Sequence, residues 1–288
     1  MTESNQSVMH SRYFLGLGPS GFHQVHYTEW GDQKNPRVLV CVHGLTRNCR
    51  DFDFLAAALE KDYRVICPDI PGRGRSEWLA NTEDYNLAVY LTDMAILFAQ
   101  LQAESIDWLG TSMGGIIGML IAAQPNNPIR RMLINDIGPS VSKVSLDRIA
   151  RYVGTDPQFP DLQQFEQYLR NVHAPFGPLT DSQWSHLASH SAKPGSDSGY
   201  SMHYDPGIAE RYKNERLTTM NLWDLWDNIK CPVLTFRGKD SDLLSADTAA
   251  EMSSRGPKST TLEFSGIGHA PALMSEDQID AVRNWFNK

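Results

Sequence analysis

Short, continuous apolar runs alternate with longer amphipathic stretches along most of the chain. Apolar runs with the length of a strand lie at 38–42 (VLVCV), 64–70, 106–110, 130–136 and 232–236. Helix-like stretches lie between and after them, at 51–61, 85–103, 113–123 and 275–287. Strands that are apolar on both faces need cover on both sides, which helices between parallel strands provide. The pattern therefore predicts an α/β fold with a mostly parallel central sheet flanked by helices.

Two regions depart from this alternation. Residues 11–30 read as an N-terminal hairpin, with a turn at 18–21 (GPSG). From about 139 to 216 no convincing strand is found, only helix-like pieces separated by Pro and Gly. Such an excursion between two buried strands is interpreted as an inserted helical cap. We therefore expect a single domain over 1–288, with its core at 11–138 and 217–288 and the cap at 139–216.

The strongest candidate for chemistry is Ser112, at the centre of Gly110-Thr111-Ser112-Met113-Gly114. The motif follows a predicted strand and precedes an apolar, helix-like stretch. A turn this sharp strains its central residue and requires small neighbours two positions away. It would expose the serine oxygen at the carboxyl end of the sheet, as a nucleophile requires. The alternative is a glycine-rich turn that carries an idle serine.

A serine needs a base, and the base needs a third group that orients it. His269 is the best-placed histidine, in the glycine-flanked loop SGIGHAP before the last predicted helix. The acid is expected after a strand that lies between the serine and the histidine. Asp240 and Asp242 both follow the strand at 232–236. Asp242 is preferred, because an apolar Leu-Leu pair after it could anchor the loop, whereas Asp240 sits beside a lysine.

Negative charge that develops on the substrate carbonyl oxygen must be met by hydrogen-bond donors. The backbone N–H of Met113, directly after the serine, is one predicted donor. The second is the backbone N–H of Leu45, in the loop His43-Gly44-Leu45-Thr46 after the first buried strand. We assign His43 a structural hydrogen bond, since it precedes the serine and abuts a strand. Arg47 could face the pocket, although an ion pair with Asp51 or Asp53 would explain it equally.

Five segments together resemble the α/β-hydrolase superfamily: HGLT (43–46), DIPGRGRS (69–76), GTSMGG (110–115), RGKDSDLLS (237–245) and GIGHAP (266–271). They occur in the family's order, from about residue 37 to the end of the chain, with the cap left out. The resemblance implies a nucleophile at Ser112, a base at His269 and an acid at Asp242. It also implies oxyanion donors at Leu45 and Met113, and no cofactor or metal.

Departures from the family's patterns reduce the number of branches of the superfamily that the sequence resembles. A serine at 112 disfavours enzymes with a carboxylate nucleophile, and HGLT lacks the HGGPG or HGGG of other branches. What remains is similar to serine carboxylesterases, enol-lactonases and cofactor-free haloperoxidase-like enzymes. The expected activity is hydrolysis of carboxylic esters of small to medium acyl chain through an acyl-enzyme. Lactonase, carbon–carbon bond hydrolase and acyltransferase activity use the same triad and stay open, as does a non-catalytic receptor.

Composition limits the partners. The formal charge is −8, from 26 basic and 34 acidic residues, and no Lys/Arg-rich run is present, which disfavours nucleic acid. The first residues lack the pattern of a secretory signal, and no apolar run has the length of a membrane span. Four scattered cysteines form no CxxC pair. These features predict a cytoplasmic protein with a small-molecule ester substrate. His186 and His190 are spaced like metal ligands but lack a completed ligand set.

Overall fold

One large sheet organises the computed structural model, which describes residues 9–195, 199–210 and 218–288. Eight strands of these residues lie in the spatial order β1-β2-β4-β3-β5-β6-β11-β12. From β4 to the last strand in this spatial order, each strand is parallel to its neighbour. Strand β2 is antiparallel to both β1 and β4. The eight strands are β1 (His10–Gly18), β2 (Gly21–Trp30), β3 (Val38–Val42), β4 (Arg64–Pro68), β5 (Ile106–Thr111), β6 (Ile129–Asn135), β11 (Val233–Gly238) and β12 (Thr260–Phe264).

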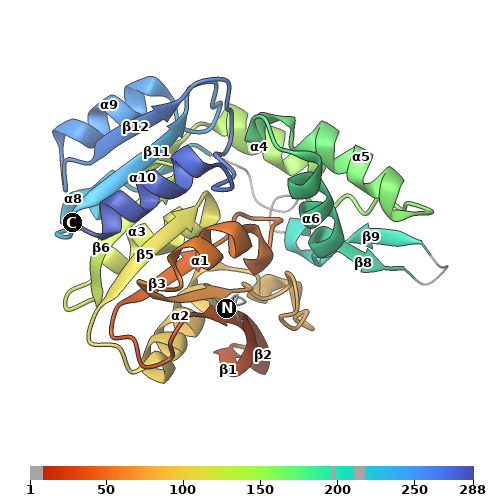
Figure 1. The fold of residues 1–288 in the computed structure, drawn as a ribbon, viewed down its shortest axis with the longest axis horizontal. Helices are drawn as coiled ribbons and strands as arrows, with labels where there is room; N and C mark the ends of the chain where they lie inside the picture. Colours follow the sequence, from red (N-terminus) through yellow and green to blue (C-terminus); the bar gives the residue numbers. More distant parts are fainter. Residues whose placement is uncertain (1–8, 196–198, 211–217) are drawn as a thin grey trace, which may run out of the picture.

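Helices connect these strands and cover both faces of the sheet (Figure 1). The α-helices that the structure describes are α1 (Asp53–Leu59), α2 (Leu87–Leu101), α3 (Met113–Ala122), α4 (Lys143–Tyr152), α5 (Leu162–Val172), α6 (Asp181–Ser191), α8 (Trp223–Asn228), α9 (Ala246–Ser254) and α10 (Glu276–Phe286). Short 3-10 helices are η1 (Cys49–Phe52), η2 (Thr82–Asp84), η3 (Ala174–Phe176) and η4 (Pro206–Ala209).

Alternation within the apolar strands decides which helices lie on which face. In β3, Val40 faces the large core cluster that also contains side chains of α2, α3, α8 and α9. Its neighbours Leu39 and Cys41 face the second cluster, which contains side chains of α1 and α10. Successive strand residues point to opposite faces, so an apolar run buries side chains in both clusters. The mostly parallel sheet with helices on both faces is confirmed.

The long helical excursion contains more strand than the sequence indicates. Helices α4, α5 and α6 lie together at one end of the molecule, drawn in green in Figure 1. Three short strands lie in the same segment: β7 (Ser140–Val141), β8 (Ala192–Pro194) and β9 (Tyr200–Met202). β8 pairs with β9, and β7 pairs with β10 (Met220–Asn221), which follows the segment. The expectation of no strand from 139 to 216 is therefore wrong. The predicted end of the cap at 216 falls outside the described residues, and the division into core and cap stays a prediction.

None of the described helices combines the length and the apolar character that crossing a membrane requires.

The parallel strands place the loops that carry chemistry at one edge. The carboxyl ends of β3, β5 and β6 pair side by side, and β11 follows β6. Loops at this edge of a parallel sheet are where binding sites form in α/β proteins. The segment that contains α4 to α6 supplies the opposite wall, because the main cavity is lined both by strand-end loops and by residues such as Ile149 and His173.

Candidate active site

Ser112 lies at a strained turn between β5 and α3. Its φ is 51° and its ψ is −113°, a conformation that costs energy for any residue with a Cβ. Two close backbone approaches hold the turn in place. A Cβ on Gly114 would lie 2.1 Å from the carbonyl oxygen of Val42, and one on Gly110 would lie 2.2 Å from that of Gly114. The spacing of the two glycines in the motif therefore follows from steric exclusion.

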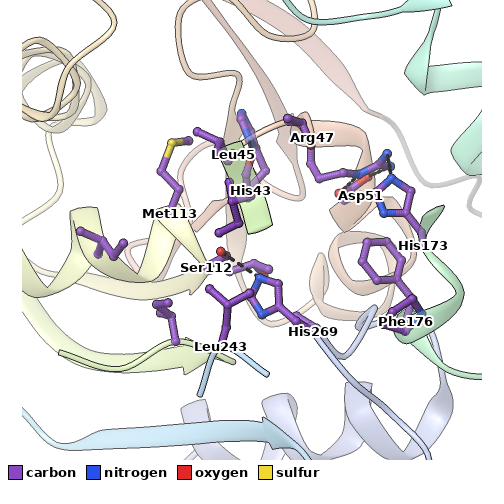
Figure 2. Close-up of a pocket in the computed structure, with 18 of the residues that line it drawn as sticks. His43, Leu45, Arg47, Asp51, Ser112, Met113, His173, Phe176, Leu243 and His269 are labelled. Carbon is purple, nitrogen blue, oxygen red and sulfur yellow. Dashed lines mark hydrogen bonds and ion pairs between the residues drawn. The ribbon is translucent and has the colours of Figure 1, made fainter. Parts of the chain in front are cut away.

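His269 reaches Ser112 from the loop between β12 and α10. The distance from His269 Nε2 to Ser112 Oγ is 3.0 Å, within the range for proton transfer between a serine and its base. The His269 side chain is partly exposed, at 18%. Figure 2 shows the two side chains joined at the floor of the cavity. The structure brings together the serine and the histidine that the sequence predicts as partners.

The acid beside His269 is Asp136, directly after β6. Its Oδ2 lies 2.8 Å from His269 Nδ1, and its carboxylate is fully buried. The hydroxyl of Ser241 donates to the same oxygen at 2.6 Å, and the N–H of Gly238 donates to Oδ1 at 2.8 Å. A buried carboxylate must be met by donors, and these contacts fix its orientation. Ser112, His269 and Asp136 therefore form one continuous chain of hydrogen bonds.

The prediction of Asp242 as the partner of His269 is wrong. The Asp242 side chain is 54% exposed and pairs with Arg148, at 2.7 Å from Arg148 Nε to Oδ2. Asp240 is exposed as well. The end of β11 and the loop after it do reach the site, but they contribute Gly238 and Ser241 as donors to the acid. Asp136 carried the same sequence signal: it follows a strand and lies between the serine and the histidine.

Leu45 and Met113 both line the cavity near Ser112 (Figure 2). Met113 is the first residue of α3, where the helix has no carbonyl to accept its N–H. Leu45 lies in the loop between β3 and η1. This placement agrees with a role as oxyanion donors, which stays a prediction. The N-terminus of α3 adds its partial positive charge at the same point.

His43 has the structural role that its position predicts. Its Nε2 accepts a hydrogen bond from the N–H of Ile70 at 3.0 Å, and its Nδ1 donates to the carbonyl oxygen of Gly44 at 2.7 Å. Both ring nitrogens are therefore engaged. Deep burial lowers the pKa of His43 to about 4, and the nearby Arg73 guanidinium acts in the same direction. His43 joins the oxyanion loop to the loop after β4 as a neutral ring.

Acidification should destabilise the fold through His43. In the unfolded chain this imidazole binds its proton near pH 6.5, whereas in the native state it does so near pH 4. Stability is therefore lost as pH falls through this window, by about 3 kcal/mol from this group. Urea unfolding at several pH values gives the free energy of unfolding as a function of pH. Between pH 6.5 and 4 this free energy should fall less steeply in His43→Gln than in the unaltered protein. An equal slope in both proteins would contradict the assignment.

The cavity above Ser112 has a volume of about 870 Å³. Most of its lining is apolar, and Arg47, Asp51 and His173 form one polar group within it. There Arg47 forms a two-point ion pair with Asp51, at 2.6 and 2.9 Å, which is one of the explanations that the sequence allows. Arg47 Nη1 also lies 3.5 Å from His173 Nε2. Burial, followed by the charges of Arg47 and His269, lowers the pKa of His173, so the ring is neutral.

Two further groups of side chains have the composition of a metal site, His26 with Cys49 and Asp69, and Asp53 with His186 and His190. In the first group, His26 Nδ1 lies 2.7 Å from Asp69 Oδ2. Burial raises the pKa of the Cys49 thiol well above its usual range, which disfavours the thiolate that metals bind.

In the second group, Asp53 accepts two hydrogen bonds from Arg50. His186 Nε2 lies 3.0 Å from the carbonyl oxygen of Arg50, so this contact docks α6 against the core.

Comparison with known proteins places this geometry in context. A family model described as the alpha/beta hydrolase fold matches residues 37–274. A 3-hydroxybutyrate-oligomer hydrolase of Cupriavidus necator is 43% identical over 278 residues, which cover 94% of this chain and 95% of that protein. Two solved structures superpose along almost the whole chain. A putative hydrolase from Rickettsia typhi has a TM-score of 0.90 at 32% identity and covers 97% of this chain and 99% of its own. An α/β hydrolase from Novosphingobium aromaticivorans has a TM-score of 0.85 at 35% identity, with 97% and 98% covered.

Proposed function

The chain belongs to the α/β-hydrolase family, and on that premise we propose that it is a serine esterase for short linear oligomers of small hydroxy acids, such as 3-hydroxybutyrate. The observation that carries the proposal is the continuous hydrogen-bonded chain from Ser112 through His269 to Asp136. Three residues in this order are what activation of a serine requires. The choice of substrate rests on the relative at 43% identity.

The reaction proceeds in two halves. His269 Nε2 takes the proton of Ser112 as the serine oxygen attacks the ester carbonyl, and the N–H groups of Leu45 and Met113 bind the resulting oxyanion. The imidazolium then protonates the leaving hydroxyl, and an acyl group remains on Ser112. In the second half His269 activates water, which releases the acid. Asp136 holds the imidazole ring in place and stabilises its positive charge throughout.

The dimensions and lining of the cavity support an oligomeric substrate. Ligand cavities of small molecules measure about 300–1,000 Å³, and a volume near 870 Å³ exceeds what a single four-carbon acid fills. Apolar side chains such as Ile116, Ile149 and Leu187 suit the methyl groups of the chain, while Arg47, Asp51 and His173 offer polar partners on one side. An acyl pocket of small to medium length fits the same space.

The proposal is tested by the products released from defined substrates. We expect the purified protein to convert the 3-hydroxybutyrate dimer and trimer to monomer, with kcat/KM higher than for p-nitrophenyl decanoate. Ser112→Ala serves as the control for serine-dependent turnover. Serine-dependent cleavage of p-nitrophenyl esters without release of monomer from either oligomer would overturn the substrate assignment and leave a simple carboxylesterase. Transfer of the acyl group to an added alcohol in preference to water would overturn hydrolysis.

A further inference from the structure

Arg73 is a fully buried arginine whose described partners are all uncharged. It lies in the loop after β4, and its side chain lines the cavity wall. Its Nε donates to the carbonyl oxygen of Leu45 at 2.8 Å, and Nη1 donates to the carbonyl oxygen of Pro71 at 2.7 Å and to the hydroxyl of Tyr90 at 2.8 Å. Its Nη2 lies 3.8 Å from the sulfur of Met113. The guanidinium thus touches both residues that we predict to bind the oxyanion.

Other buried arginines of the described chain are neutralised by a carboxylate. Arg47 pairs with Asp51, and Arg237 pairs with Glu263 at 2.6 Å. Among the described residues no ion pair forms at Arg73. A charge buried without a counter-ion is expensive, so the fold maintains this positive charge at a cost. Its field already acts on the neighbouring loop, where it is one of the causes that lower the pKa of His43.

The position of the charge suits a reaction that creates an anion. The Leu45 carbonyl faces the buried guanidinium, which fixes the orientation of the residue whose N–H is the predicted donor. Met113, the other predicted donor, contacts the same guanidinium, since Arg73 Nη2 lies 3.8 Å from its sulfur. A fixed positive charge behind two donors stabilises developing negative charge without reorganisation.

We propose that Arg73 is a positioning residue for ester hydrolysis, which holds the oxyanion loop through the Leu45 carbonyl and stabilises the anionic transition state by its unneutralised charge. This inference rests on the proposed function, since it requires an oxyanion at Ser112. A purely structural role is the alternative, because Arg73 also bonds Pro71 and Tyr90 of its own surroundings. The two roles differ in which species the arginine stabilises: the transition state alone, or the folded site as a whole.

The variants separate charge from packing. Arg73→Gln keeps a hydrogen-bond donor but removes the charge, and Arg73→Lys keeps the charge but loses the planar fork. The matched control is Arg64→Gln. Arg64 is the first residue of β4, the strand that precedes the Arg73 loop, it pairs with Glu29 at 2.6 Å, and it is not among the residues that line the cavity. Thermal unfolding of each variant reports whether the fold is kept, and Arg73→Lys carries the test if the glutamine variant does not fold.

The readout compares ligands with and without an oxyanion. Ser112 Oγ adds to the carbonyl carbon of a trifluoromethyl ketone analogue of the ester, and His269 takes the serine proton. The former carbonyl oxygen then carries a negative charge in the site. The corresponding methyl ketone has nearly the same shape but stays neutral. For Arg73→Gln we expect kcat to fall about tenfold to a hundredfold, less than for loss of a direct donor, with KM almost unchanged. Affinity for the trifluoromethyl ketone should fall by the same factor, and affinity for the methyl ketone should not.

Recovery of part of kcat by Arg73→Lys would further support a role of the charge. The inference is overturned if Arg73→Gln keeps the kcat of the unaltered protein, or if it loses affinity equally for both ketones, which is the mark of a structural role. If the unaltered protein and Arg64→Gln both show serine-dependent turnover, either of these outcomes overturns the role of Arg73 and leaves the proposed esterase function standing. If Ser112→Ala retains turnover, it is the proposed function that fails.

Discussion

Replacing Ser112 by alanine should lower kcat for ester hydrolysis by about 10⁶, the loss typical of a missing triad nucleophile. The change removes only the hydroxyl oxygen, whose contact with His269 is 3.0 Å, and it leaves the strained turn with a Cβ as before. We therefore expect unaltered thermal unfolding, with loss of turnover and not of the fold. Initial rates on a p-nitrophenyl ester, measured beside the unfolding curve, check both parts.

The matched control for this change is Ser189→Ala. Ser189 is exposed on α6, and its hydroxyl donates to the carbonyl oxygen of Ser185 within the helix. It should keep the activity of the unaltered protein. If Ser112→Ala retains a rate above about one hundredth of the original, a value far outside the range for nucleophile loss, the assignment of Ser112 is refuted.

The second large effect is expected at Asp136. Asp136→Asn should lower kcat by about 10⁴, because an amide cannot stabilise the imidazolium charge of His269 and can favour the wrong tautomer of the ring. Asp242→Asn should change kcat by less than about fivefold, since an exposed ion pair such as the one with Arg148 is worth at most ~1 kcal/mol. Steady-state kinetics of the two variants compare an acid that touches His269 with one that does not.

The reverse ranking, with Asp242→Asn the more damaging change, would restore the sequence-based choice of acid and contradict the assignment of Asp136. Ser241→Ala adds an intermediate case. It removes the hydroxyl that donates to Asp136 Oδ2 at 2.6 Å and leaves the carboxylate in place. A loss of activity between those of the two aspartate variants is therefore expected.

The elements that the sequence predicts correctly are those with a local physical cause. The apolar run at 38–42 coincides with β3, because a strand covered on both faces leaves a continuous apolar signature. The elbow around Ser112 is recognisable from the local spacing of its two glycines. Gly110 is required by a contact within the turn, whereas the contact that excludes a side chain at Gly114 comes from Val42 of β3. His269 can be predicted as the base from its position, because its loop is the last one before the final helix.

The acid was missed because its place depends on how two strand ends meet. Asp136 and Asp242 follow neighbouring strands, β6 and β11, and both loops reach the same edge of the sheet. Asp136 turns toward His269 because its φ is 57° and because Gly238, at the end of β11, and Ser241, in the loop after it, donate to its carboxylate. No pattern within either segment contains that information. The short strands β8 and β9 leave no comparable signature in the sequence, because each has three residues and neither joins the central sheet.

An acyl-enzyme on Ser112 can be trapped by rapid mixing with p-nitrophenyl butyrate, followed by acid quenching and peptide mass spectrometry. We expect a burst of one p-nitrophenolate per protein molecule and a butyryl group on the peptide that contains Ser112. Neither the burst nor the adduct should form in Ser112→Ala. A full burst in Ser112→Ala, or a butyryl group on another residue that turns over at the rate of catalysis, would refute nucleophilic catalysis by Ser112.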